Sequence, residues 1–458
     1  MTAIRTQICR SMLGNSVALL ATAQITAALG YVFWMVCAQK FPASVIGVSN
    51  TVIAAMTLVA MVTVSGFIPM LTRLLPGADA EERSGLCSTA FVLTITLSGG
   101  VGAVSALFLP DRMHAAIGTG WLVLLISTGA MASSMVLVVG AALLGIRRAE
   151  LSLLSDVAGS IARLSALATI LAVGLVAVSV VDAGARTILG IWVGSLALSA
   201  AVGVSLLARA QLDFRFRPHL KWMHRVRRSV GWDHLAMLAV RTPPFLIPIL
   251  ASAVFHAEEL GYLAMTTMVA SAFFAVGSAV SNALLADCAD DPQRLRVQVR
   301  RALRLISLLL LPPVVITCIL AREVLSFFGP GYAQHSPLLI LLLLATLPDA
   351  LTNVAVAILR VRRRLPIVAA ITVTGSVLIV GGAWLAMQRF GVLGAGLAVL
   401  VAHTLIATAF SVVGLRSFLK RGSTVEASGP KAGEFNAITL GVSTEVDAPG
   451  DSDAGVAR

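Results

Sequence analysis

Apolar runs long enough to cross a lipid bilayer recur along almost the whole chain, and they constrain the fold more than any other feature. A helix needs about 20 mostly apolar residues to span a hydrocarbon layer of roughly 30 Å. The sequence offers twelve such windows, at 14–38, 45–70, 86–109, 119–146, 152–180, 187–208, 232–255, 261–286, 303–321, 336–359, 366–388 and 392–416. Because 58% of residues are hydrophobic and only 12% are charged, soluble, disordered and disulfide-scaffold classes are excluded. We therefore predict an all-α polytopic membrane protein with twelve transmembrane helices.

The distribution of Lys and Arg predicts the orientation, since cytoplasmic loops carry the excess of basic residues. With the N-terminus inside, 27 basic residues fall on the cytoplasmic side and 5 in outer loops, which leaves Arg163 and Arg241 within helices. Both termini are therefore expected in the cytoplasm, and topology alone explains the net charge of +12, so nucleic acid is not expected as a partner. Trp34, Trp121 and Trp384 fall near predicted outer ends and are interpreted as membrane-interface anchors.

A basic stretch divides the windows into two sets of six. We predict an N-terminal lobe over 1–208, a basic cytoplasmic linker over 209–231, a C-terminal lobe over 232–421 and a disordered acidic tail over 422–458. Two short matches indicate a duplication: ALLGIRRAEL from Ala142 with AILRVRRRLP from Ala357, offset 215, and VIGV around Gly47 with ELGY around Gly261, offset 214. Since each unit holds an even number of helices, the lobes are expected to be parallel repeats around a central cavity.

Arg163 and Arg241 lie deep in otherwise apolar windows, one in each half. A guanidinium stays charged, and placing it at the bilayer centre costs about 2.5–3.5 kcal/mol on the mildest insertion scale. Pro243, Pro244 and Pro248 follow Arg241, and each frees a backbone carbonyl one turn earlier. Because broken helices at mid-depth are typical of transporter binding sites, we interpret both arginines as candidate substrate contacts.

The alternative for both arginines is structural ion pairing. Asp156, seven residues before Arg163, is a possible partner for it, and Asp349 or Asp233 is a possible partner for Arg241. Asp349 is itself a candidate for ion coupling, as are Asp156 and Asp233.

Further polar residues at membrane depth are expected to face the bundle interior. Asn353, a further candidate substrate contact, follows Asp349 by one helical turn, so the two share a face. His403 has the titration range of a proton relay, although a lone histidine is more often a packing residue. Gln24, in the middle of the first window, is a candidate substrate contact or an interhelical hydrogen-bonding group.

Several classes of chemistry lack support in the sequence. There is no G-x-x-x-x-G-K-[ST] motif and no inner loop long enough for a nucleotide-binding domain. The outer connections are too short for a catalytic domain. The cysteines, Cys9, Cys37, Cys87, Cys288 and Cys318, form no metal-ligand spacing. The sequence therefore favours a transporter without a cofactor or metal over an enzyme.

Specific segments resemble polysaccharide flippases of the multidrug/oligosaccharidyl-lipid/polysaccharide exporter (MOP) superfamily. Between Val324 and Arg364 the matching features are F-G-P-x-Y-A, L-P-D-A and a closing R-V-R-R-R. The opening pair FWMVCAQKFPASVIGVSNTVIA, the R-L-L-P at Arg73 and the run AVRTPPFLIPIL from Ala239 are also similar. The resemblance covers residues 10–416.

The resemblance implies a flippase that moves an undecaprenyl-diphosphate-linked oligosaccharide from the inner to the outer leaflet of a bacterial plasma membrane. Two six-helix lobes would rock around a central cavity in which Arg163 and Arg241 hold the diphosphate, and glycosyltransferases or a polymerase of the same pathway are possible partners. A drug or organic-cation antiporter of the same superfamily is one alternative. A non-transporting membrane scaffold for polysaccharide enzymes is another.

Overall fold

The computed structural model describes residues 25–174, 181–210, 238–239, 241–289 and 295–420, with Phe216 and Pro218, and gives side chains up to residue 410. Within these residues the chain is helical and has no β-strand. Ten helices are long and apolar enough to cross a membrane, and they coincide with ten of the predicted windows. This confirms the all-α membrane class.

The two remaining windows are described only in part. A helix covers residues 25–40 of the first window, and the seventh contains a helix of 12 residues, α11. The full count of twelve therefore stays a prediction. Gln24, Asp233, the predicted tail and most of the basic linker lie outside the described residues.

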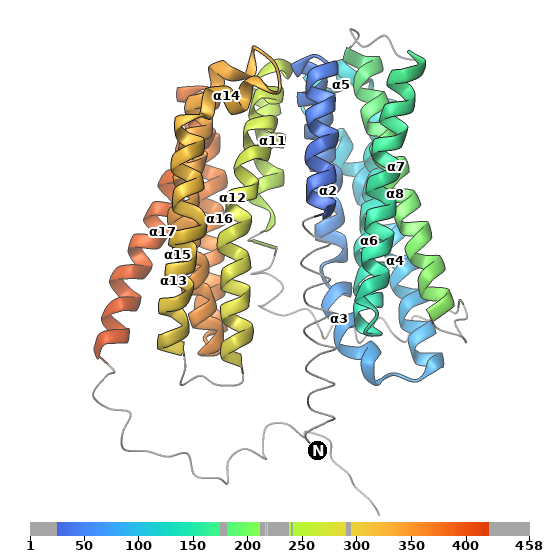
Figure 1. Cartoon of the computed structure of the whole chain (residues 1–458). Coiled ribbons are helices and arrows are strands. Elements are labelled where there is room, and N and C mark those ends of the chain that lie inside the picture. Colours follow the sequence, from blue (N-terminus) through green and yellow to red (C-terminus); the bar gives the residue numbers. More distant parts are fainter. Residues whose placement is uncertain are drawn as a thin grey trace, which may run out of the picture. The chain divides into compact units, whose positions relative to one another are not determined.

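The first half, residues 25–210, begins with the helix over 25–40 and continues through helices that pack mainly on one another (Figure 1). The labelled elements are α2 (Ala43–Val64), α3 (Phe67–Leu74), η1 (Leu75–Gly77), α4 (Ala80–Leu107), α5 (Asp111–Ile117), α6 (Thr119–Gly145), α7 (Ala149–Val173) and α8 (Val181–Ala210). In this half α6 contacts α2, α4, α7 and α8, so it forms the centre of the packing.

The second half, residues 238–410, repeats the pattern of long helices joined by short ones (Figure 1). Its elements are α11 (Pro243–Val254), α12 (Ala257–Ala289), α13 (Leu295–Ile319), α14 (Ala321–Ser326), η4 (Tyr332–His335), α15 (Ser336–Val361), α16 (Leu365–Phe390) and α17 (Val392–Lys420). Pro312 and Pro313, within the ninth predicted window, lie inside α13 without ending it. Membrane helices tolerate such residues because neighbouring groups satisfy the freed carbonyls.

Helix ends follow local sequence signals. Asp79 precedes α4, and its Oδ1 accepts a hydrogen bond from the Glu82 backbone N–H at 2.7 Å. This N-cap satisfies one of the donors that a helix start leaves unpaired. Glu81 and Glu82 in the first turn are also favourable at the positive end of the helix dipole.

The basic turns after α6 and α15 have the same hydrogen bonding. Arg148 N–H donates to the Leu143 carbonyl at 2.9 Å, and Arg364 N–H donates to the Leu359 carbonyl at 2.9 Å. In each turn the preceding arginine, Arg147 or Arg363, takes a left-handed conformation with φ of 61° and 56°. These are Schellman motifs with arginine at the position that usually holds glycine. They correspond at an offset of 216 residues, one more than the offset of the sequence match.

The halves meet where α2 crosses α12. A Cβ atom placed on Gly47 would overlap the Ala257 carbonyl oxygen, and a Cβ placed on Gly261 would overlap the Ala43 carbonyl oxygen. Gly261 and Ala257 lie 214 residues after Gly47 and Ala43, respectively, so the two contacts are equivalent. The same offset relates the matching sequences around these glycines. The crossing is therefore a close backbone contact between equivalent points of two similar units.

Candidate substrate-binding groups

Arg163 lies on α7 and is half-buried against α8. Its Nε donates to Ser195 Oγ at 3.0 Å, and its Cζ lies 3.7 Å from the centroid of the Trp192 ring. The Phe33 ring lies farther away, with its centroid 5.9 Å from Cζ. A guanidinium over an indole face is a favourable cation–π contact, and desolvation strengthens it. The charge is thus placed within a membrane-spanning helix by aromatic stacking.

An aromatic cluster supports this position. Phe33, Trp34 and Trp192 have ring centroids 5.6–5.8 Å apart, which joins the helix over 25–40 to α8. Trp34 is 7% exposed, so its interpretation as an interface anchor is wrong. Trp121 and Trp384 are 45% and 36% exposed, as an interface position requires. Trp34 differs because it packs in the cluster that supports Arg163.

Arg163 has no carboxylate partner in the part of the chain that the structure describes. Asp156, considered as its partner from the sequence, lies beside Ser199 of α8 instead. A guanidinium carries five N–H donors, and only the Nε–H of Arg163 has a protein acceptor within the described residues. The group is therefore positioned but has hydrogen-bonding capacity left for an anion.

Arg241 lies just before α11, and its side chain is exposed. No carboxylate among the described residues pairs with it, and Asp349, one of the suggested partners, is engaged elsewhere. Pro243 has no backbone N–H to donate to the carbonyl of Ala239, one turn earlier. That carbonyl instead accepts a hydrogen bond from Ser376 Oγ of α16. The helix interruption is thus stabilised by the protein itself. The α11 helix packs on α2, so Arg241 stands at the start of a helix that contacts the other half.

Asp349, Asn353 and His403 come together inside the second half. Asn353 Nδ2 donates to Asp349 Oδ2 at 2.9 Å, and His403 Nδ1 lies 3.4 Å from Asp349 Oδ1. The Phe274 ring of α12 lies 5.8 Å from the imidazole. The sequence predicted that Asp349 and Asn353 share a helix face. It could not predict that His403 of α17 lies next to them, because that contact depends on how the helices pack. This cluster is separate from Arg163, which lies in the first half.

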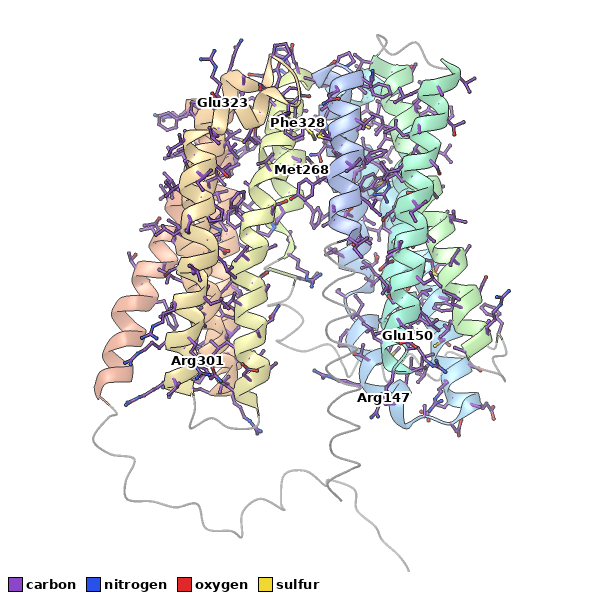
Figure 2. All side chains as sticks on the ribbon, in the orientation of Figure 1. Arg147, Glu150, Met268, Arg301, Glu323 and Phe328 are labelled. Atoms are coloured by element: carbon purple, nitrogen blue, oxygen red, sulfur yellow. The ribbon has the colours of Figure 1, made fainter. Side chains whose placement is uncertain are left out.

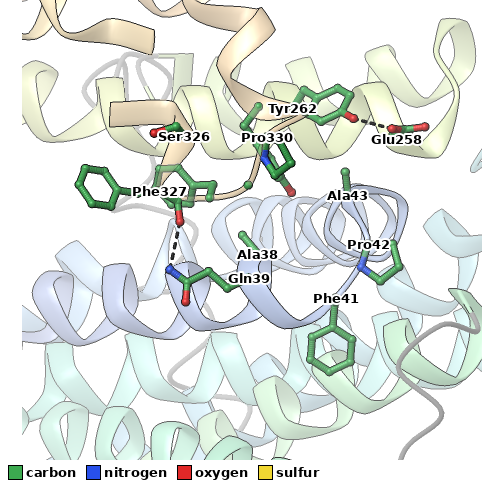
Figure 3. A pocket seen from close by; sticks show the side chains of 14 residues that line it. Ala38, Gln39, Phe41, Pro42, Ala43, Glu258, Tyr262, Ser326, Phe327 and Pro330 are labelled. Atoms are coloured by element: carbon green, nitrogen blue, oxygen red, sulfur yellow. Dashed lines mark hydrogen bonds between the residues drawn. The ribbon is translucent and has the colours of Figure 1, made fainter. Parts of the chain in front are cut away.

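Hydrogen bonds between the halves involve residues that the sequence did not single out. Tyr31 Oη donates to the carbonyl of Met268, a residue that Figure 2 labels, at 2.9 Å. Gln39 Nε2 donates to the Phe327 carbonyl at 3.0 Å (Figure 3). Arg112 Nη1 of α5 donates to the carbonyls of Val254 and Phe255, both at 3.0 Å. We call this region, which includes α5 and α14, the α5–α14 end; the count of basic residues predicts that it faces outward.

A cavity of about 510 Å³ lies in the seam at this end, between Gln39, Pro42 and Ala43 on one side and Tyr262, Phe327 and Gly331 on the other (Figure 3). Tyr262 Oη donates to Glu258 on its wall, and the His335 ring stacks on Tyr262 with centroids 4.2 Å apart. The cavity belongs to the joint between the halves, and Arg163 and Arg241 do not line it.

Comparison with known proteins gives a fold and no sequence family. No protein-family model matches the chain, and no curated protein sequence matches it. An inward-facing multidrug resistance MATE family transporter of the MOP superfamily aligns with TM-score 0.68 and 15% identity, over 89% of this chain and 99% of that one. The lipid II flippase MurJ in an inward closed conformation aligns with TM-score 0.69 and 12% identity, over 88% and 89%.

A third structure, a MOP superfamily transporter from Pyrococcus furiosus described as having a binding pocket of reverse polarity, aligns with TM-score 0.56 and 14% identity, over 90% of this chain and 96% of that one. The chain therefore has the fold of MOP-superfamily transporters, a class that includes both drug exporters and a lipid flippase. The fold that the resemblance in the sequence implies is therefore confirmed. Which substrate the chain carries is a separate question.

Proposed function

We propose that the protein is a flippase that moves a lipid-diphosphate-linked oligosaccharide from the inner to the outer leaflet for the synthesis of cell-surface polysaccharide. The observation that carries the proposal is Arg163, whose charge is held in a membrane-spanning helix by Trp192 and has no carboxylate partner among the described residues. The planar donors of arginine match the paired oxygens of phosphate. An undecaprenyl-diphosphate-linked glycan supplies two such phosphates, while its lipid tail remains in the bilayer.

Arg241 supports the same substrate class. It is exposed, it lies in the half opposite Arg163, and it precedes a proline-interrupted helix that contacts the first half. In an alternating-access cycle, a cation on each half would allow both halves to contact one diphosphate group. The fold similarity to a lipid II flippase is compatible with a lipid-linked substrate.

Reconstituted flipping tests the proposal. Proteoliposomes that contain a fluorescent undecaprenyl-diphosphate sugar are compared for the unmodified protein, Arg241→Ala and Arg209→Ala. Arg209 is the matched control because it is an exposed arginine in the last turn of α8. We expect flipping by the unmodified protein and by Arg209→Ala, and a loss with Arg241→Ala. Equal rates for the three proteins would remove Arg241 from the mechanism.

A second candidate, a drug or organic-cation antiporter, is favoured by the Asp349–His403 pair inside the second half and by the fold similarity to a MATE transporter. It predicts cation-dependent dye efflux that requires Asp349. The scaffold alternative predicts neither flipping nor efflux from a correctly folded protein.

Location and partners follow from the flippase proposal. The protein would be a multi-pass component of the bacterial plasma membrane with both termini in the cytoplasm, and glycosyltransferases or a polymerase would supply and consume its substrate. Protease protection of an epitope added to either terminus, in spheroplasts, tests the orientation; cleavage from outside would contradict it.

A further inference from the structure

We propose that Gly47 and Gly261 are the contact on which the two halves close at the α5–α14 end, and that any side chain at either position shifts the protein toward a state in which this end is open. The inference rests on the proposed transport function, since it assigns the positions that control one step of the alternating-access cycle.

The geometry leaves no room for a methyl group at the crossing of α2 and α12. A Cβ atom on Gly47 would lie less than 3.0 Å from the carbonyl oxygen of Ala257, and a Cβ atom on Gly261 would lie less than 3.0 Å from the carbonyl oxygen of Ala43. Cβ atoms in folded proteins essentially never come that close to another heavy atom. In both cases the obstacle is backbone, which cannot rotate away as a long side chain can. The helices must therefore separate to accept alanine at either position.

The contact is symmetric. Gly47 approaches Ala257 and Gly261 approaches Ala43, so each half presents the same glycine-centred surface to the other. This is the arrangement of an isologous interface, in which equivalent patches face each other across a two-fold axis. It follows that substitution of either glycine alone should have a similar effect, which a chance contact would not require.

Hydrogen bonds between the halves surround the glycine contact. Gln39 donates to the Phe327 carbonyl, Tyr31 donates to the Met268 carbonyl, and Arg112 donates to the last carbonyls of α11. A helix C-terminus has unpaired carbonyls and a partial negative charge, so Arg112 is well placed to bind there. Separation of the helices at the glycines would stretch these bonds, and the structure is therefore a state with this end closed.

Distances between spin labels measure the opening directly. Cysteines replace Phe108 in the first half and Phe327 in the second, in a background without native cysteines. Both residues are exposed, by 83% and 66%, and the Phe327 bond to Gln39 uses only the backbone oxygen. Pulsed electron paramagnetic resonance on the labelled protein in lipid nanodiscs then measures the distance between the two labels. The population with the shorter distance is the closed state and the population with the longer distance is the open state, which gives the closed-to-open ratio.

Gly47→Ala and Gly261→Ala are compared with Gly100→Ala, a position on α4 with no atom within 4 Å of the added Cβ. We expect the closed-to-open ratio to fall roughly 5- to 150-fold in both test variants, the range typical of coupled conformational equilibria, and to stay unchanged in the control. Since alanine favours helix more than glycine does, a shift in the test variants cannot come from a weaker helix.

An unchanged ratio in either test variant would overturn the proposal. If these variants do not fold, Arg112→Gln removes the two guanidinium hydrogen bonds to the Val254 and Phe255 carbonyls without adding volume. A shift toward the open state then supports the proposal, and no shift overturns it. A protein whose label distances respond as expected but which flips no lipid-linked glycan would contradict the proposed function and leave the glycine contact intact.

Discussion

Replacement of Arg163 by methionine separates a substrate-binding role from a structural one. The substitution keeps an unbranched side chain of similar length but removes the charge and the N–H donors. The structure predicts a small effect on stability and a large effect on transport, because the contacts that Arg163 makes with the protein are about as favourable as its burial is costly.

The magnitudes follow from its surroundings. Loss of the cation–π contact with Trp192 costs about 2 kcal/mol for a desolvated pair, and loss of the charged bond to Ser195 costs about 1.5–3 kcal/mol. Against these losses, about 2.5–3.5 kcal/mol is recovered because a charge no longer lies within the membrane. The net loss is about 0–2.5 kcal/mol. If two remaining N–H groups bind phosphate, loss of these bonds raises the KM for the lipid substrate at least about 100-fold.

Two measurements on the same preparation check this reasoning. Thermal unfolding followed by tryptophan fluorescence reports stability, and flipping rates against lipid concentration report KM. Arg163→Lys is the companion variant: it keeps the charge but loses the planar stacking and the Nε bond, so we expect an intermediate KM. An Arg163→Met protein that is strongly destabilised yet flips with unchanged KM would refute the reasoning and make the arginine structural.

Three further predictions concern single contacts. Ser376→Ala leaves the Ala239 carbonyl without its donor and should lower the free energy of unfolding by about 1–3 kcal/mol, measured by thermal unfolding; Ser376→Thr, which keeps the hydroxyl, should lose less. Arg147→Gly relieves a left-handed non-glycine residue and should stabilise the protein by about 1 kcal/mol, while Arg148→Gly should not; a loss of stability at 147 would refute the assigned turn. Asp349→Asn should leave lipid flipping within a factor of about three, since its partners lie within its own half. Abolished flipping would contradict this prediction, whereas a cation-dependent dye efflux that Asp349→Asn abolishes would favour the antiporter.

The membrane class and most helix positions follow from the sequence because the length of an apolar run is local information. Ten windows coincide with candidate spans, and the ninth window forms α13 although it contains Pro312 and Pro313. The sequence shows the duplication as two short matches. The hydrogen bonds of the basic turns after α6 and α15 show that the structurally equivalent residues there are 216 apart, one more than the 215 of the sequence match. A left-handed arginine is the unexpected element there, since glycine is the usual residue at that position.

The surroundings of the candidate site were less predictable because they depend on which helices pack together. The sequence placed Arg163 in a spanning helix, but the Trp192 stack and the burial of Trp34 arise from contacts between separate helices. It also indicated that Pro243 frees a carbonyl, but could not identify Ser376 as its donor. Gly47 and Gly261 were recognised as repeated positions without any sign that they meet.

The central claim is that fixed positive charge on the two halves binds the phosphates of a lipid-linked glycan. Native mass spectrometry of protein mixed with undecaprenyl-diphosphate sugar tests it directly, with the unmodified chain, the double variant Arg163→Met/Arg241→Ala and the control Arg209→Ala. The account predicts one bound lipid on the unmodified and control proteins and a loss of binding of at least about 100-fold on the double variant. Equal lipid binding by all three proteins would contradict it.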